Sequence, residues 1–225
     1  MNLAQWLSRG ALALGALGAL LAPGPAGAAA AGGAAPPALV VLGDSLSAGY
    51  GLRVEDGWVA LLERRLAAQG YGYRVINASV SGETTAGGLA RLPHVLDRHR
   101  PAIVIIELGG NDGLRGLPVA EVRRNLTELV SRSRAAGARV LLVGTRMPGN
   151  YGPRYTEQYF QNFAAVARAE HVPLVPSLLA GVAAEERNFQ ADRLHPTAAV
   201  QPQLLDAVWR GLEPLLGPRP GAPGR

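Results

Sequence analysis

The sequence predicts a single α/β domain in which a five-stranded parallel sheet lies between two layers of helices. Three observations support this fold class: short apolar runs alternate with amphipathic segments, the strongest runs contain almost no polar residue, and small polar loops follow three of them. Fully apolar strands are typical of parallel sheets, because helices cover both faces of such sheets. No linker or internal repeat divides the chain.

The predicted strands are 38–42, 73–78, 101–108, 139–144 and 172–175. The first is an apolar run that stops at a Gly-Asp-Ser turn, and the third is the strongest strand signal in the chain. Because a helical segment separates each strand from the next, we expect a single doubly wound parallel sheet.

The predicted helices are 56–70, 84–98, 118–137, 156–170 and 197–216. Asp56 is expected to cap the first of them. Pro93 is expected to interrupt the second helix and begin a new turn, since proline lacks the backbone N–H. The final helix is expected to be irregular at Pro202.

The first 28 residues have the pattern of a secretory signal peptide. An Ala/Leu-rich segment at 10–21 is followed by Ala26-Gly27-Ala28, which resembles a cleavage site. We expect residues 29–37 to be flexible, residues 38–216 to form the domain, and the Pro/Gly-rich tail 217–225 to be disordered. The mature protein is therefore predicted to be periplasmic or secreted.

Composition excludes several classes of function. The chain has no cysteine, which rules out disulfides, a thiol nucleophile and cysteine-ligated metals. All 22 basic residues are arginines, and they are scattered over predicted helix faces without interleaved aromatic residues. This distribution favours solvated surfaces over a nucleic-acid partner. No metal or organic cofactor is implied.

Polar residues gather where three consecutive predicted strands end. These loops are Gly43-Asp44-Ser45, Ser81-Gly82-Glu83 and Gly109-Gly110-Asn111-Asp112. In a parallel sheet they lie at the same edge. Later in the chain, Asp192 precedes His195 by three residues, a spacing that lets a carboxylate reach the imidazole Nδ1. Acyl transfer by a serine needs a nucleophile, a base, an orienting acid and oxyanion donors, and all four types are present.

These segments resemble the four blocks of the GDSL, or SGNH, hydrolase family. The matching blocks are Gly43-Asp44-Ser45-Leu46-Ser47, Gly82, Gly109-Gly110-Asn111-Asp112 and Asp192-Arg193-Leu194-His195-Pro196. Longer matches at 43–51, 109–116 and 150–152 resemble the thioesterase I group of bacteria, whose members are also described as lysophospholipase L1 or arylesterase. The resemblance covers about residues 38–216 and implies a flavodoxin-like three-layer fold.

The resemblance also implies the roles of individual residues. Ser45 would be the nucleophile, His195 the general base and then acid, and Asp192 the residue that orients His195. The backbone N–H groups of Ser45 and Gly82 and the side-chain amide of Asn111 would form the oxyanion hole. Segment 112–117 would move as substrate binds. The G-x-S-x-G elbow of α/β-hydrolases is absent, because Ser47 occupies the position of its second glycine.

The expected activity is hydrolysis of carboxylic esters and thioesters, including lysophospholipids, through an acyl-serine intermediate. We expect a monomer that contacts a membrane surface transiently. The residues expected to bind substrate are Asp112, Leu114, Leu117, Met147, Pro148, Asn150 and Tyr151.

Two other functions fit parts of this pattern. A carbohydrate O-acetylesterase would use the same triad, but an aromatic content of 5% is low for a sugar cleft. A flavodoxin-like domain without enzymatic activity would bind phosphate in the first loop, where Asp44 would repel it. Taken separately, Asp192 and His195 could be a surface ion pair or metal ligands, and Asp44 could cap its turn or support the site.

Overall fold

The computed structural model describes residues 35–218. Their sheet has the strand order β2-β1-β3-β4-β5, and every neighbouring pair is parallel. The strands are β1 (Ala38–Gly43), β2 (Arg74–Asn77), β3 (Ile103–Glu107), β4 (Arg139–Val143) and β5 (Leu174–Val175). The predicted signal peptide and most of the predicted disordered tail lie outside the described residues. Within 35–218, no helix has both the length and the apolar character needed to cross a bilayer.

The two central strands are the most deeply buried. Every residue of β1 and β3 is buried, and the two strands pair in register from Leu39 opposite Ile103 to Gly43 opposite Glu107. This burial on both faces explains why their sequences are apolar runs without alternation. Glu107, the last residue of β3, is the exception to that pattern.

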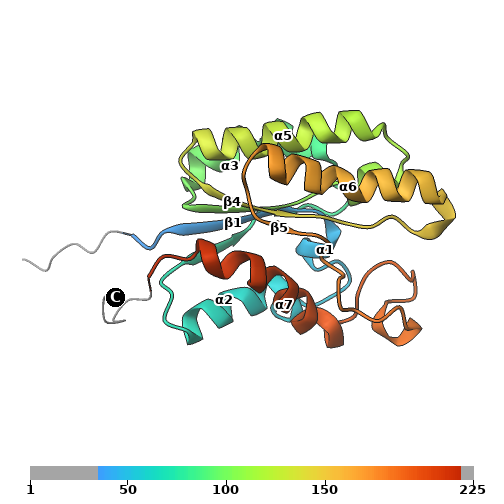
Figure 1. The fold of residues 1–225 in the computed structure, drawn as a ribbon. Helices are drawn as coiled ribbons and strands as arrows, with labels where there is room; N and C mark the ends of the chain where they lie inside the picture. The colour runs from blue at the N-terminus through green and yellow to red at the C-terminus, as the bar shows by residue number, and fades with distance from the viewer. Residues whose placement is uncertain (1–34, 219–225) are drawn as a thin grey trace, which may run out of the picture. The chain divides into compact units, whose positions relative to one another are not determined.

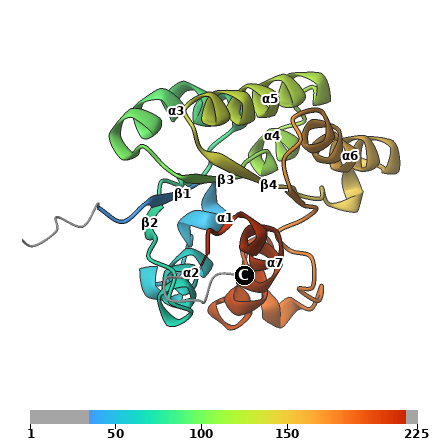
Figure 2. The same cartoon turned by 60° about the vertical axis from the view of Figure 1, so that its left-hand side comes forward.

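Helices cover both faces of the sheet (Figures 1 and 2). One face carries α3 (Thr85–His99), α5 (Val119–Ala135) and α6 (Pro153–Ala169), whereas α2 (Trp58–Ala68) and α7 (Gln201–Leu212) cover the other. The fold is therefore the predicted single α/β domain with a five-stranded parallel sheet. Two short helices, α1 (Ser45–Ala48) and α4 (Gly110–Leu114), follow β1 and β3 directly. The 3₁₀ turns are η1 (Val54–Asp56), η2 (Gly149–Tyr151), η3 (Glu186–Asn188), η4 (Ala198–Val200) and η5 (Glu213–Leu215).

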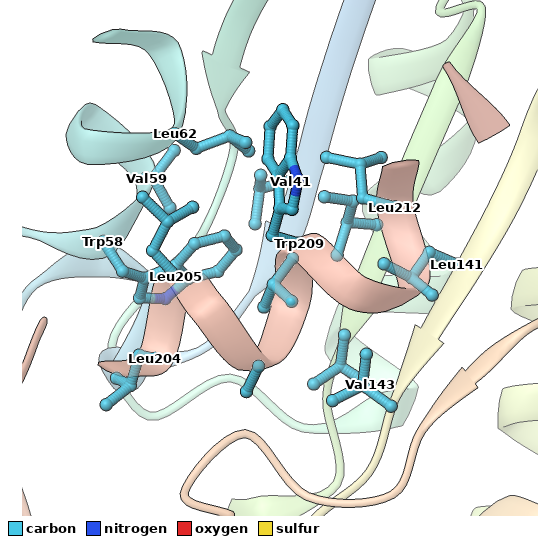
Figure 3. Packing of buried hydrophobic residues seen from close by; sticks show 14 of the residues in the cluster. Val41, Trp58, Val59, Leu62, Leu141, Val143, Leu204, Leu205, Trp209 and Leu212 are labelled. Atoms are coloured by element: carbon cyan, nitrogen blue, oxygen red, sulfur yellow. The ribbon is translucent and has the colours of Figure 1, made fainter. Parts of the chain in front are cut away.

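Alternate residues of each strand enter different cores. Val40 and Val104 face the α3, α5 and α6 side, whereas Val41 and Ile105 face the α2 and α7 side. Figure 3 shows the second core, where side chains of α2 and α7 gather over the sheet. The side chains labelled there are Val41, Trp58, Val59, Leu62, Leu141, Val143, Leu204, Leu205, Trp209 and Leu212.

The start of α2 differs from the prediction. Asp56 does not cap this helix, because its carboxylate lies 3.0 Å from Arg53 Nε and it ends η1 instead. Gly57 is the N-cap residue and supplies no side-chain acceptor. The acceptor comes from the other end of the chain: Trp58 N–H donates to Gln201 Oε1 at 3.0 Å.

Two prolines were expected to disturb their helices, and only one of them stands beside an irregularity. Pro93 does not break α3, which runs continuously from Thr85 to His99. Pro93 is exposed, whereas Leu92 and Val95 are fixed in the core, so packing on the opposite face holds the helix together. The predicted final helix is irregular next to Pro202, because the 3₁₀ turn η4 ends at Val200 and α7 begins at Gln201. Pro202 thus lies in the first turn of α7, where its missing N–H leaves no intrahelical bond unmade.

Candidate active site

Ser45 lies at the tight turn between β1 and α1. Asp44 is the N-cap residue of α1, and its Oδ1 accepts a hydrogen bond from Leu46 N–H at 3.0 Å. Gly49 ends this short helix in the left-handed conformation, with φ of 75°. Ser45 is therefore the first residue of a helix that begins at the carboxyl end of a central strand. Its backbone N–H belongs to the first turn, where α-helices leave N–H groups without intrahelical acceptors.

A hydrogen-bonded chain connects Ser45 to His195 and Asp192. The distance from Ser45 Oγ to His195 Nε2 is 2.8 Å, and that from His195 Nδ1 to Asp192 Oδ2 is 2.7 Å. The other carboxylate oxygen of Asp192 accepts from the backbone N–H groups of His195 at 3.0 Å and Leu194 at 2.9 Å. These bonds from His195 and Leu194 lower the pKa of Asp192 to about 2. Asp192 is therefore ionised beside the imidazole at neutral pH.

The loop that carries His195 is fastened to the loop that carries Ser45. Gln190 N–H donates to the carbonyl of His195 at 2.8 Å, and Gln190 Nε2 donates to the carbonyl of Tyr50 at 2.8 Å. The rings of Tyr50 and His195 have centroids 4.6 Å apart. The Tyr50 ring therefore packs against the imidazole, and Gln190 holds the backbone of His195. These contacts keep His195 beside Ser45, from which 150 residues separate it in the sequence.

Asn111 lies in the turn after β3, and its side-chain amide points toward the Ser45 turn. Asn111 Nδ2 donates to the carbonyl of Glu83 at 2.9 Å and to Asp44 Oδ2 at 3.2 Å. Both hydrogens of this amide therefore have acceptors in the protein. The longer of the two bonds goes to Asp44, directly beside Ser45.

Gly82 lines the same cleft in a conformation that favours glycine. Its φ is 80°, and a Cβ built on it would meet no atom within 4 Å. Arg115 Nη2 donates to the carbonyl of Gly82 at 3.0 Å, which fixes the orientation of this peptide. The requirement for glycine here comes from the backbone angle, since the space around it is open.

Two carboxyl groups are buried below the Ser45 turn. Burial raises the pKa of Asp44 to about 6, opposed by the hydrogen bond from Leu46 and by the nearby His195. Glu107 is fully buried at the end of β3, and its Oε2 accepts from Ser47 Oγ at 2.6 Å. Burial, followed by the charge of Asp44, raises the pKa of Glu107 well above its usual value. Asp44 and Glu107 therefore each accept a hydrogen bond from α1, the short helix that begins at Ser45.

Asp112 is buried and bonded within the fold, away from the cleft. It is fully buried, and its carboxylate accepts from Thr85 N–H at 2.9 Å and Thr85 Oγ1 at 2.5 Å. These bonds fasten the first residue of α3 to the turn after β3. Asp112 does not line the cleft.

A cleft of about 750 Å³ opens over Ser45 and His195 at the carboxyl edge of the sheet. Three of the residues expected to bind substrate line it: Leu114, Met147 and Pro148. Leu117, Asn150 and Tyr151 do not. Leu117 packs against the core under α3, α5 and α6, and the hydroxyl of Tyr151 donates to the carbonyl of Leu114 at 2.8 Å. Tyr151 therefore supports a lining residue from behind.

Several lining residues were not anticipated from the sequence: Tyr50, Arg146, Leu179, Phe189 and Leu194. Tyr50 and Leu194 stand one to five residues from Ser45 and His195, so proximity to those motifs was an available signal. No comparable signal marks Leu179 or Phe189, which reach the cleft through the long connection after β5. Within 35–218, no group of three His, Asp or Glu side chains is arranged to hold a metal ion.

A hydroxyl, an imidazole and a carboxylate in line, beside backbone and amide donors at the strand ends of an α/β sheet, define a serine hydrolase site. Comparison with known proteins narrows this class. Residues 41–201 match the model of the GDSL-like lipase/acylhydrolase family. The chain therefore belongs to that family.

Curated relatives agree with this assignment. The chain is 54% identical to "Esterase TesA" of Pseudomonas aeruginosa over 183 residues, which are 81% of this chain and 91% of the relative. It is 40% identical to "Thioesterase 1/protease 1/lysophospholipase L1" of Escherichia coli K12 over 183 residues, covering 81% and 86% of the two chains. The crystal structure of TesA matches with a TM-score of 0.78 at 54% identity, over 80% of this chain and 99% of that one.

Proposed function

We propose that Ser45 is the nucleophile of this enzyme, His195 its general base and acid, and Asp192 the group that orients His195. The type of reaction follows from family membership: the chain is an ester and thioester hydrolase of the SGNH type. The observation that supports these roles is the continuous chain from Ser45 Oγ to His195 Nε2 at 2.8 Å and from His195 Nδ1 to Asp192 at 2.7 Å.

The geometry suits acylation followed by hydrolysis. His195 Nε2 takes the proton of Ser45 Oγ as that oxygen attacks the carbonyl carbon, and the same imidazole then gives the proton to the departing alkoxide or thiolate. The ester bond breaks and an acyl-Ser45 ester remains. A water molecule then attacks this ester, again giving its proton to His195, and the free acid leaves. Asp192, ionised throughout, stabilises the imidazolium in each step.

The oxyanion is proposed to accept hydrogen bonds from the N–H groups of Ser45 and Gly82 and from Asn111 Nδ2. Asn111 can serve only if one of its two present bonds is released, and the 3.2 Å bond to Asp44 is the longer one. Asp44 would then hold the amide in place between turnovers. Exchanging one acceptor for another leaves the amide satisfied while charge develops on the substrate.

The cleft suits the acyl chain of a fatty ester or thioester. Leu114, Met147 and Pro148 supply an apolar wall beside Ser45, and Tyr151 supports it from behind. Asp112, Leu117 and Asn150 are proposed to act only indirectly, through the position of this wall. Small-molecule acyl substrates of this kind include the esters, thioesters and lysophospholipids that the names of the relatives describe.

The test is hydrolysis of p-nitrophenyl esters with two to sixteen carbons, beside a long-chain acyl-CoA and a lysophospholipid. We expect turnover of both esters and thioesters, and a loss of about 10⁴-fold or more in kcat for Ser45→Ala. Undiminished turnover by Ser45→Ala would contradict the assignment of the nucleophile.

We also propose that the enzyme works in the periplasm or outside the cell. The apolar segment and the Ala-Gly-Ala sequence before residue 29 support this location. Expression in a bacterium should release protein whose mass corresponds to removal of about the first 28 residues. Full-length protein confined to the cytoplasmic fraction would contradict this proposal.

A further inference from the structure

Arg146 is a cationic residue on the wall of the active-site cleft. It lies just after β4, is exposed, and lines the cleft together with Ser45 and His195. Its guanidinium carbon stands 3.5 Å from the centroid of the Phe160 ring. Neither a hydrogen bond nor an ion pair joins this guanidinium to any residue within 35–218.

The other charged residues on the rim of the cleft are already paired. Arg193 Nη2 lies 2.7 Å from Glu186 Oε1, and Arg187 Nη2 lies 2.6 Å from Glu185 Oε2. Asp44 and His195 belong to the hydrogen-bonded cluster around Ser45 described above. Among the described lining residues, Arg146 is thus the cation whose charge no carboxylate offsets.

The contact with Phe160 positions the Arg146 guanidinium and leaves its N–H groups available to a ligand. An arginine stacked on an aromatic face is held in position by the ring, while its N–H groups point outward in the guanidinium plane. Those N–H groups match the oxygens of a phosphate in a two-pronged arrangement. The ring fixes the cation without using any of its hydrogen-bond donors.

The place of Arg146 in the sheet relates it to the scissile bond. Ser45 follows β1 and Arg146 follows β4, with β3 between these strands. Neighbouring strands lie about 4.8 Å apart, so the two strand ends are on the order of 10 Å apart. One substrate molecule can therefore reach both residues. A fatty acyl chain carries no anion, so a phosphate bound at Arg146 would belong to the leaving group.

We propose that Arg146 binds a phosphate in the leaving group of the substrate, so that the enzyme prefers acyl esters and thioesters whose alcohol or thiol carries a phosphate. This inference rests on the proposed function, because it assumes that the ester lies at Ser45. Two sources have this chemistry: the glycerol phosphate of a lysophospholipid and the nucleotide of coenzyme A.

Two matched pairs of substrates separate these sources. The first compares decanoyl-glycerol 3-phosphate with decanoyl-glycerol, and the second compares decanoyl-CoA with the decanoyl thioester of N-acetylcysteamine. The members of the first pair differ only in one phosphate, whereas those of the second differ in the pantoyl and adenosine groups of coenzyme A as well as in its phosphates. The preference is the ratio of the two kcat/KM values within a pair. Arg146→Gln should lower this ratio about tenfold in at least one pair, through the KM of the substrate that carries phosphate. The pair that responds identifies the source.

Arg154→Gln is the matched control, because Arg154 is an exposed arginine near the start of α6 that does not line the cleft. It should leave both ratios unchanged. Phe160→Leu keeps the charge but removes the ring, and it should lower the affected ratio by a smaller factor. Ratios that stay constant in Arg146→Gln, or that fall equally in Arg154→Gln, would overturn the proposal. Failure of the proposed function is distinct: the parent would then not cleave p-nitrophenyl butyrate, or Ser45→Ala would cleave it as well.

Discussion

Asn111 shows how a single side chain can have both a structural and a chemical role. In the free protein its amide joins the turn after β3 to the carbonyl of Glu83 and to Asp44. In the proposed mechanism the same amide donates to the oxyanion. Its contribution should therefore appear in the transition state more than in substrate binding.

Asn111→Ala should lower kcat by about 10²–10³-fold with little change in KM, since one oxyanion donor is typically worth that much. The measurement is steady-state hydrolysis of p-nitrophenyl butyrate. His171→Asn, at an exposed left-handed position outside the cleft, should retain the parent kcat. A loss in Asn111→Ala of less than threefold would remove Asn111 from the oxyanion hole.

Glu107 gives a prediction about stability and pH. Its pKa is raised in the folded protein because burial disfavours the charged carboxylate. A carboxyl group with a raised folded pKa contributes most to stability below its unfolded pKa, and that contribution is lost as pH rises toward the folded pKa. Glutamine cannot ionise, and the Ser47 hydroxyl can accept from its amide as well as donate.

Glu107→Gln should therefore unfold at a higher urea concentration than the parent at pH 8, and the difference should shrink toward pH 5. Glu63→Gln, on the exposed face of α2, provides the comparison and should follow the parent at both pH values. The gain in unfolding midpoint of Glu107→Gln over the parent should be larger at pH 8 than at pH 5. A gain that is smaller at pH 8 would contradict a raised pKa for Glu107.

At the level of elements, the joint between α2 and α7 determines how the end of the chain closes the fold. Gln201 is buried at the start of α7, and its Oε1 is the acceptor for Trp58 N–H at the start of α2. Farther along, Arg65 pairs with Asp206 at 2.7 Å and lies over the ring of Trp209. The loop with His195 precedes α7, so this joint lies just after the segment that carries the proposed general base.

Gln201→Met should destabilise the protein by about 1–3 kcal/mol, because it leaves a buried N–H without an acceptor. Urea unfolding measures this loss. Gln203→Met, two residues farther along on the exposed face of α7, should change stability by no more than about 0.5 kcal/mol. Equal effects of the two substitutions would show that the bond from Trp58 contributes nothing.

Sequence patterns predicted elements better than the joints between them. The central strands β1 and β3 could be identified because a strand buried on both faces has almost no polar residues in its sequence. The prediction for Asp56 was wrong because the local sequence offers a capping side chain, whereas the acceptor for Trp58 N–H is Gln201, 143 residues farther along the chain. Pro93 was misjudged because its intrinsic cost is local, whereas the packing that overrides it involves Leu92 and Val95 in the core.

At the level of the whole molecule, parallel topology brings distant segments to one edge of the sheet. Ser45, Gly82 and Asn111 each follow a strand, so a prediction of strands alone placed them near one another. Only part of the cleft wall could be predicted, namely Leu114, Met147 and Pro148. Arg146 and Phe160 meet because β4 and α6 pack together, and the residues between them carry no motif for that contact.

The reactivity of Ser45 can be observed by treating the protein with an alkylphosphonate p-nitrophenyl ester and mapping the adduct by mass spectrometry. Attack by an activated serine releases one p-nitrophenolate per protein and leaves a stable phosphonate that resembles the tetrahedral intermediate. We expect a single adduct on Ser45, formed far more slowly in His195→Ala. An adduct on another residue, or labelling of Ser45 at the same rate without His195, would contradict the proposed triad.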